Sequence, residues 1–233
     1  VQGGTSAGKT YGVLQYLIVA AHKNSLEGLI SIVSESLPHL RRGAMRDFFA
    51  ILTANDMYRE RQHNKSSHTY KIKKATFEFF SADQGDKLRG ARRDYLFVNE
   101  ANNIGYEAWS ELFIRTRKWS IIDFNPVSEF WAHTEILGHP DKDFRDKVRF
   151  VKLNYTHNEA LDQVTIDNIE SRKHDPDWWQ VYGLGEVGTP TGVIFPPSVW
   201  SVGELPDNAR YICSGMDFGE SNPTTLIDLW QHD

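Results

Sequence analysis

The chain has 233 residues, which suffices for one large domain or for one domain and part of another. Its 40% hydrophobic and 24% charged residues exclude wholesale disorder, and its single cysteine, Cys213, excludes an intramolecular disulfide framework. The net charge of -5 argues against a surface that coats nucleic acid uniformly, although local basic patches remain compatible with it.

The sequence predicts strands and helices that alternate along the chain. Helices are predicted where apolar residues recur at helical spacing, at residues 10–21, 42–53, 106–115 and 164–172. Short apolar runs predict strands at 29–33, 95–98, 120–124 and 148–155, and a hairpin formed by 70–73 and 76–80. This alternation indicates an α/β fold with a mainly parallel, doubly wound sheet. No apolar run reaches the length of about eighteen residues that a membrane span requires, so we expect no membrane partner.

The composition of the chain changes after Tyr182. Glycine and proline become frequent between residues 183 and 197, which indicates an ordered connector. We therefore expect a first domain at 1–182, a connector at 183–210, and the start of a second domain at 211–233 that opens with a strand at 211–218. A glycine-rich loop begins at the third residue, where several strand residues should precede it, so we expect position 1 to lie within a longer protein.

The chain opens on a complete phosphate-loop motif, G-x-x-x-x-G-K-[ST], formed by Gly3, Gly4, Thr5, Ser6, Ala7, Gly8, Lys9 and Thr10. Its glycines let successive backbone amides point at the β-phosphate, and the positive end of the following helix adds to the attraction. We expect Lys9 to reach the β- and γ-phosphates and Thr10 to ligate Mg²⁺. A chance glycine-rich turn would not explain the helical pattern directly behind the loop. The motif therefore predicts a site for ATP and Mg²⁺, within a P-loop NTPase fold.

A phosphate loop needs a strand that ends in a carboxylate opposite it. The apolar run 95–98 is followed by Asn99 and Glu100, at the position where such a strand would emerge from the sheet. We expect Glu100 to act as the general base. Asn99 stands where an aspartate is usual, and its neutral carbonyl could still hold a magnesium-bound water. The alternative is that Glu100 is an ordinary strand-end or helix-capping carboxylate.

Several further segments are informative through their order: 89–102, 122–126 with 130–131, 153–158, 178–186 and 215–219. Together with the phosphate loop they resemble, across nearly the whole chain, the large terminase subunit of tailed bacteriophages. The resemblance implies a P-loop ATPase domain, a linker and the first strand of a ribonuclease-H-like nuclease, whose first metal-binding residue would be Asp217. It also implies that Asn125 senses the phosphate state. Unlike many members of that family, this chain has no arginine inside its phosphate loop.

The function that this resemblance implies is ATP hydrolysis that drives double-stranded viral DNA into a procapsid. The implied partners are duplex DNA, the portal protein, the small terminase subunit and sister copies of the chain in a ring, in the host cytoplasm at the portal. Nuclease activity is expected only from the full-length protein. Arg89 or Arg92, just before the catalytic strand, would complete the site of a neighbouring subunit.

Three alternative functions share parts of this pattern. A helicase-type translocase has the same loop and acidic strand, but it lacks the nuclease-like opening at 215–219. A small-molecule phosphotransferase would need a lid and an acceptor pocket, for which we find no sequence. A nucleotide-binding module that does not hydrolyse remains compatible with Asn99.

Overall fold

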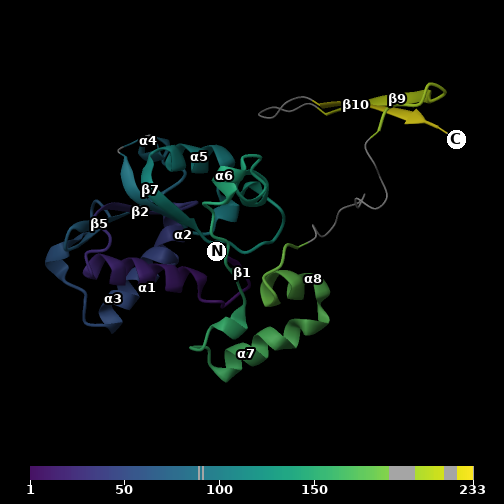
Figure 1. Cartoon of the computed structure of the whole chain (residues 1–233). Coiled ribbons are helices and arrows are strands. Elements are labelled where there is room, and N and C mark those ends of the chain that lie inside the picture. Colours follow the sequence, from purple (N-terminus) through teal and green to yellow (C-terminus); the bar gives the residue numbers. More distant parts are fainter. Residues whose placement is uncertain (89, 91, 189–202, 218–224, 233) are drawn as a thin grey trace. The chain divides into compact units, whose positions relative to one another are not determined.

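The computed structural model describes residues 1–88, 90, 92–188, 203–217 and 225–232, which belong to two compact units, Val1–Thr191 and Gly192–Asp233 (Figure 1). Each unit is treated by itself. No helix within the described ranges has the length and apolar character that crossing a lipid bilayer requires.

The first unit is built on a six-stranded sheet in the order β3-β4-β5-β2-β6-β7. The strands are β2 (Gly28–Ser34), β3 (His63–Asn64), β4 (Thr69–Ile72), β5 (Ala75–Ser81), β6 (Arg93–Val98) and β7 (Thr116–Ile122). The neighbours β5, β2, β6 and β7 run parallel, and β3 and β4 extend the sheet antiparallel beyond β5. The predicted hairpin and the predicted parallel sheet are both confirmed.

A short parallel pair continues beyond β7. It consists of β1 (Gln2–Gly3) and β8 (Lys152–Leu153), and a single bridge between Gln2 and Phe124 joins it to the chain that leaves β7. The strand predicted at 148–155 is therefore only two residues long. Its partner β1 is equally short, so β1 offers no further strand residues with which β8 could pair.

Helices connect these strands, and they are α1 (Lys9–His22), α2 (Leu37–Arg42), α3 (Ala44–Ala54), α4 (Gly85–Leu88), α5 (Tyr106–Ile114), α6 (Lys142–Arg145), α7 (Gln163–Glu170) and α8 (Pro176–Trp178). The helix predicted at 42–53 corresponds to α3, and a separate helix that was not predicted, α2, precedes it. The two meet at Gly43, whose backbone lies outside the helical region and whose amide ends α2 by donating to the His39 carbonyl at 2.9 Å. The helices predicted at 10–21, 106–115 and 164–172 correspond to α1, α5 and α7.

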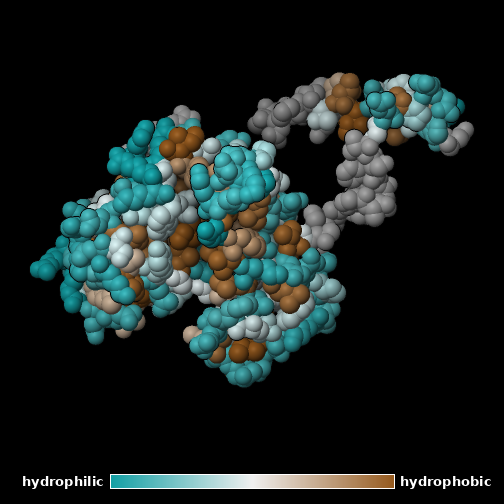
Figure 2. Space-filling model, in the orientation of Figure 1, coloured by the Kyte–Doolittle hydropathy of each residue, from teal (hydrophilic) through white to brown (hydrophobic). Residues whose placement is uncertain are grey.

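Both faces of the sheet are covered, because alternate residues of a strand point to opposite sides. On one face, α1 and α3 pack over β2, β5 and β6 around the fully buried Phe48, Phe77 and Phe97. On the other face, Leu96 and Val98 pack with the side chains of α5 in a second cluster. This covering explains why β6 reads as an unbroken apolar run. Figure 2 shows that the outer surface in view is largely hydrophilic, with hydrophobic side chains in separate patches.

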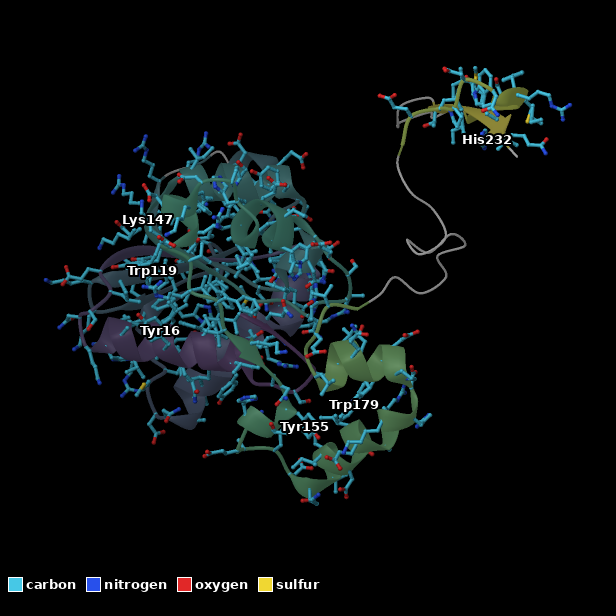
Figure 3. The ribbon with its side chains drawn as sticks, turned by 45° about the vertical axis from the view of Figure 1, so that its right-hand side comes forward. Tyr16, Trp119, Lys147, Tyr155, Trp179 and His232 are labelled. Atoms are coloured by element: carbon cyan, nitrogen blue, oxygen red, sulfur yellow. The ribbon has the colours of Figure 1, made fainter. Side chains whose placement is uncertain are left out.

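The unit closes with a helical segment that follows β8. It comprises a turn at Tyr155–His157, α7, a turn at Ser171–His174, α8 and a π-helical turn at Trp179–Gly183. Tyr155 and Trp179 pack edge to face with their ring centroids 6.1 Å apart, and both are labelled in Figure 3. Residues 184–188, still within the first unit, then turn back toward β7, and Gly188 donates to the Pro126 carbonyl at 2.9 Å.

The second unit contains an antiparallel hairpin of β9 (Arg210–Asp217) and β10 (Thr225–Gln231). The predicted strand at 211–218 thus corresponds to β9, except for residue 218, which lies outside the described residues. Several large apolar side chains of the hairpin are exposed, namely Tyr211, Ile212, Met216, Leu226, Ile227, Leu229 and Trp230. The predicted domain limits at 182 and 210 and the nuclease assignment stay predictions.

Phe48 is the centre of the aromatic cluster between α3 and the sheet, where it contacts Phe77 and Phe79 at centroid distances of 4.8 and 5.2 Å. We expect Phe48→Ala to lower the free energy of unfolding by about 3–5 kcal/mol, because it leaves a cavity in a closed core. Urea denaturation followed by circular dichroism measures this loss. Phe150→Ala is the matched control, since Phe150 is 48% exposed, and it should cost about 1 kcal/mol or less. Equal losses in the two variants would contradict the core assignment.

Candidate nucleotide-binding site

The phosphate loop leaves β1 and curls around the side chain of Lys9. The Lys9 Nζ atom donates to the carbonyl oxygens of Gly3 at 3.0 Å and Gly4 at 2.8 Å, and to Asn125 Oδ1 at 2.7 Å. Gly8 precedes α1 with a φ of 74°, a left-handed conformation that a side chain would disfavour. The sequence folds into this curl because glycines occupy its ends, and the curl brings the lysine and the start of α1 to one place.

The helical segment after β8 braces the loop from outside. Thr5 donates its amide to the Tyr182 carbonyl at 2.8 Å, and Asn158 Nδ2 donates to the Ser6 carbonyl at 2.8 Å. A Cβ atom on Gly4 would lie 2.3 Å from the same Tyr182 oxygen, so only glycine fits there. The conformation of the loop is therefore held by residues more than a hundred positions away.

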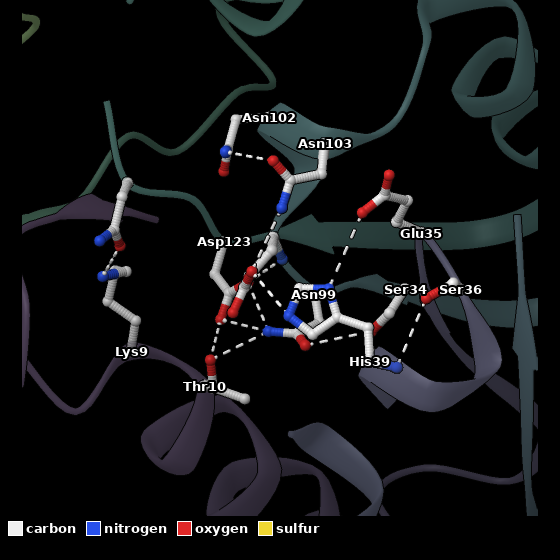
Figure 4. Close-up of polar contacts among 12 residues, drawn as sticks. Lys9, Thr10, Ser34, Glu35, Ser36, His39, Asn99, Asn102, Asn103 and Asp123 are labelled. Atoms are coloured by element: carbon white, nitrogen blue, oxygen red, sulfur yellow. Dashed lines mark hydrogen bonds and ion pairs between the residues drawn. The ribbon is translucent and has the colours of Figure 1, made fainter. Parts of the chain in front are cut away.

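A row of polar side chains crosses the carboxyl ends of three parallel strands. The register of β2, β6 and β7 places Ser34, Asn99 and Asp123 side by side. Ser34 Oγ donates to Asn99 Oδ1 at 3.1 Å, and Asn99 Nδ2 donates to Asp123 Oδ1 at 3.1 Å and to Thr10 Oγ1 at 3.1 Å. Thr10 in turn donates to Asp123 Oδ2 at 2.5 Å, as Figure 4 shows. The phosphate loop and the strand ends thus form one hydrogen-bonded network.

This geometry differs from the expectation for Asn99 in one respect. Its carbonyl oxygen accepts from Ser34, and its amide nitrogen is directed at Thr10 and Asp123. The carbonyl of Asn99 is therefore already engaged away from Thr10. Asn99, at 1% exposure, holds a buried carboxylate in place.

Glu100 follows directly and occupies the left-handed region, with φ 55° and ψ 54°. Its amide donates to Asp123 Oδ1 at 2.8 Å, and the amide of Ala101 donates to the Asp123 backbone carbonyl at 2.9 Å. The Glu100 carboxylate is 46% exposed and lies 3.0 Å from His39 Nε2 and 3.3 Å from Asn103 Nδ2. Such a conformation costs a non-glycine residue about 1–3 kcal/mol, and residues that adopt it are found most often at functional sites.

The charges of the site act on Lys9. Burial lowers the pKa of the Lys9 ammonium, and the carboxylates of Asp123 and Glu100 partly oppose this by raising it. A phosphate group would add to the same opposing effect, because a nearby anion favours the charged form of a lysine. The site thus pairs one buried cation with a negatively charged strand edge.

The donors present fit a magnesium ion better than a transition metal. Thr10 and Asp123 offer a hydroxyl and a carboxylate, which are the oxygen ligands that Mg²⁺ prefers alongside substrate phosphates. Within the described parts of the chain, no group of three or more His, Cys, Asp or Glu side chains could hold a metal ion. The site therefore suits an ion that enters with a nucleotide rather than one that is bound by the protein alone.

The remaining predicted residues fall into different places. Asn125 joins the site through Lys9, as described, whereas Arg89 lies outside the described residues. Arg92 is exposed ahead of β6, where it is free of the core. Its neighbour Arg93 is 1% exposed and lies over the Phe80 ring at 5.6 Å, so it is an internal residue. Asp217 ends β9 in the second unit, and its role stays a prediction.

Sequence reasoning missed Asp123, Asn158, Tyr182 and His39 as residues of this site. Asp123 had only a partial signal, because it lies near the end of the strand predicted at 120–124, while the place of that strand in the sheet was not predicted. Asn158 and Tyr182 had none, since they act through contacts with the loop backbone that no motif encodes. His39 lies in α2, and its contact with Glu100 follows only from the fold.

A phosphate loop that opens a helix, beside polar strand ends of a parallel sheet, defines a P-loop nucleotide-binding protein. The model of the family described as phage terminase large subunit matches residues 1–186. The chain belongs to the phage terminase large subunit family. No curated protein sequence matches it.

Solved structures of large terminases share this fold. The large terminase of a thermophilic bacteriophage is 20% identical with a TM-score of 0.68, and the match covers 96% of this chain and 57% of that one. The same large terminase in complex with ADP is 19% identical with a TM-score of 0.68, covering 100% and 59%. The large terminase ATPase domain of Thermus phage P74-26 is 16% identical with a TM-score of 0.50, covering 78% and 85%. This chain thus spans less than two thirds of the length of that thermophilic bacteriophage's large terminase.

Lys9→Ala should abolish measurable nucleotide turnover and weaken nucleotide binding, because it removes the ammonium group that the loop is wrapped around. Calorimetric titration with ATP and a phosphate-release assay measure the two effects. Lys23→Ala is the control, since Lys23 is exposed at the other end of α1. A folded Lys9→Ala protein with normal turnover would rule out this loop as the nucleotide site.

Proposed function

We propose that this chain hydrolyses ATP and that hydrolysis drives translocation of double-stranded viral DNA. The observation that carries the proposal is the network that joins Thr10 of the phosphate loop to Asn99 and Asp123 at the strand ends, and through Asp123 to the Glu100 amide. Lys9 is held beside it by Asn125. ATP would lie along the loop, with its phosphates at Lys9 and at the start of α1. Magnesium, when bound with ATP, would neutralise charge on the β- and γ-phosphates, held by Thr10 and the strand edge.

Glu100 is the general base of this proposal. Its carboxylate is exposed at the edge of the site, and its backbone is fixed by the hydrogen bonds that its own amide and the Ala101 amide donate to Asp123. A carboxylate held in this way can accept a proton from a water that attacks the γ-phosphate. His39 and Asn103 orient the same carboxylate.

Asn125 connects the nucleotide to the rest of the unit. Its Oδ1 atom accepts from Lys9 at 2.7 Å, and a γ-phosphate would compete with it for the same ammonium group. Asn125 also begins the segment that continues through Pro126, whose carbonyl accepts from Gly188. A change of hydrogen-bond partner at Lys9 would therefore affect Asn125 and, through Pro126, the segment that contains Gly188.

The packaging role and its partners rest on family membership. They comprise duplex DNA, the portal protein, the small terminase subunit and a ring of sister copies on the procapsid in the host cytoplasm. A first domain at 1–182, a connector at 183–210 and the start of a nuclease at 211–233 complete the proposal. The exposed apolar side chains of the β9–β10 hairpin support the last part, because an isolated two-stranded hairpin is marginally stable and needs a larger core.

Glu100→Gln should leave ATP binding intact and slow hydrolysis by about a hundredfold or more, because the amide keeps the shape but cannot accept the proton. Binding of ATP by calorimetry and phosphate release in single turnovers separate the two effects. Glu107→Gln, on the exposed side of the first turn of α5, is the control and should retain full activity. Full hydrolysis by Glu100→Gln would show that Glu100 is not the general base.

An arginine of a neighbouring copy is expected to stabilise the transition state, and Arg92 or Arg89 would supply it. We expect Arg92→Ala or Arg89→Ala to slow hydrolysis in the assembled ring by about a thousandfold. Mixing the Glu100→Gln chain with either arginine variant on portal and DNA should restore part of the activity, because one interface then joins an intact base to an intact arginine. Phosphate release by the mixed rings measures this. Arginine variants that keep full activity in the ring would exclude the assignment.

A further inference from the structure

The strand β6 is followed by Asn99 and by the proposed general base Glu100. At the position of Asn99 a P-loop enzyme usually carries a negative charge, and this chain does not. Its residue at that position is Asn99, which is neutral. The neighbouring strand β7 ends at Ile122, and the next residue, Asp123, is 1% exposed. Its carboxylate is therefore a buried charge at the carboxyl edge of the sheet.

Asp123 makes the contact that identifies a magnesium-shell carboxylate. In P-loop NTPases the ion is held between the hydroxyl that ends the loop motif and a strand-end aspartate. Here the Thr10 hydroxyl donates to Asp123 Oδ2 at 2.5 Å. The same hydroxyl also accepts from Asn99, but through the amide nitrogen, which cannot ligate a cation.

We infer that Asp123 supplies the carboxylate of the magnesium shell, from the strand next to the one that usually carries it. Asn99 is then a positioning residue that fixes Asp123 by a hydrogen bond from its amide. The inference rests on the proposed ATP site. It extends that proposal by assigning the magnesium carboxylate to a residue outside the motif at 99–100.

The charge of Asp123 can be tested apart from its structural contacts. Asp123 also accepts the amide of Glu100 at 2.8 Å, so its loss could act by moving the base. An asparagine at 123 keeps one oxygen for that amide, while the charge and the second acceptor oxygen, which Thr10 uses, are lost. Exchanging the two side chains, with Asp at 99 and Asn at 123, keeps one carboxylate and one amide in mutual contact.

The decisive measurement is the gain in ATPγS affinity when Mg²⁺ replaces EDTA, determined by calorimetry without any turnover. Asp123→Asn should reduce this gain about tenfold or more, the usual effect of losing a carboxylate around a bound metal. In EDTA the variant should bind ATPγS as tightly as the parent protein or more tightly, because a buried negative charge no longer repels the phosphates. A gain equal to that of the parent protein would overturn the inference.

The exchanged variant Asn99→Asp/Asp123→Asn should recover most of the gain. A loss in Asp123→Asn that the exchange does not recover assigns Asp123 a structural role and also overturns the inference. If Asp123→Asn does not fold, as judged by circular dichroism, Asp123→Glu decides. It keeps the charge but moves the carboxylate by one methylene, so the gain should fall, and an unchanged gain would count against the inference.

Asp94→Asn is the matched control. Asp94 lies near the amino end of β6, at the end of the strands that is opposite to the site. Its carboxylate accepts the Leu29 amide at 2.9 Å. Its substitution removes a partly buried, amide-bound carboxylate without touching the loop, so the magnesium gain should not change. The proposed function fails in a different way, namely if the parent protein binds no ATPγS in Mg²⁺.

Discussion

The parallel alignment of β2, β6 and β7 is the constraint on which the site depends. Because these strands run in the same direction and in register, their carboxyl ends meet at one edge. Ser34, Asn99 and Asp123 are each 1% exposed or less at that edge, so their polar atoms must find partners within the protein. Among the described contacts, the row that ends on Thr10 supplies these partners, together with the Glu100 amide that Asp123 accepts.

The same constraint explains the backbone of Glu100. A left-handed conformation at a glutamate is unfavourable by itself, and here it persists because Asp123 accepts its amide while the Asp123 carbonyl accepts the next one. The side chain consequently leaves the sheet edge toward His39 rather than continuing along the strand. The position of the carboxylate is thus set by contacts within the protein itself.

Much of this architecture could be predicted from the sequence, because local patterns determine it. The helix behind the phosphate loop, the β4–β5 hairpin and the buried strand β6 follow from apolar periodicity. The short β8 could not be predicted, since its length depends on what β1 offers as a partner. The role inferred for Asp123 could not be predicted from its position near a strand end alone, because it depends on which strand lies next to β6, and that order is a property of the whole sheet.

The contacts around Gly4 have a mechanical consequence. Thr5 is tied to the Tyr182 carbonyl, and a Cβ atom on Gly4 would lie 2.3 Å from that oxygen, so the loop and the turn at Trp179–Gly183 touch without slack. Close-packed groups of this kind transmit displacement rather than absorb it. A shift of the loop by a few tenths of an ångström would therefore displace that turn as well. The helical segment after β8 would in this way transmit movement away from the candidate nucleotide site.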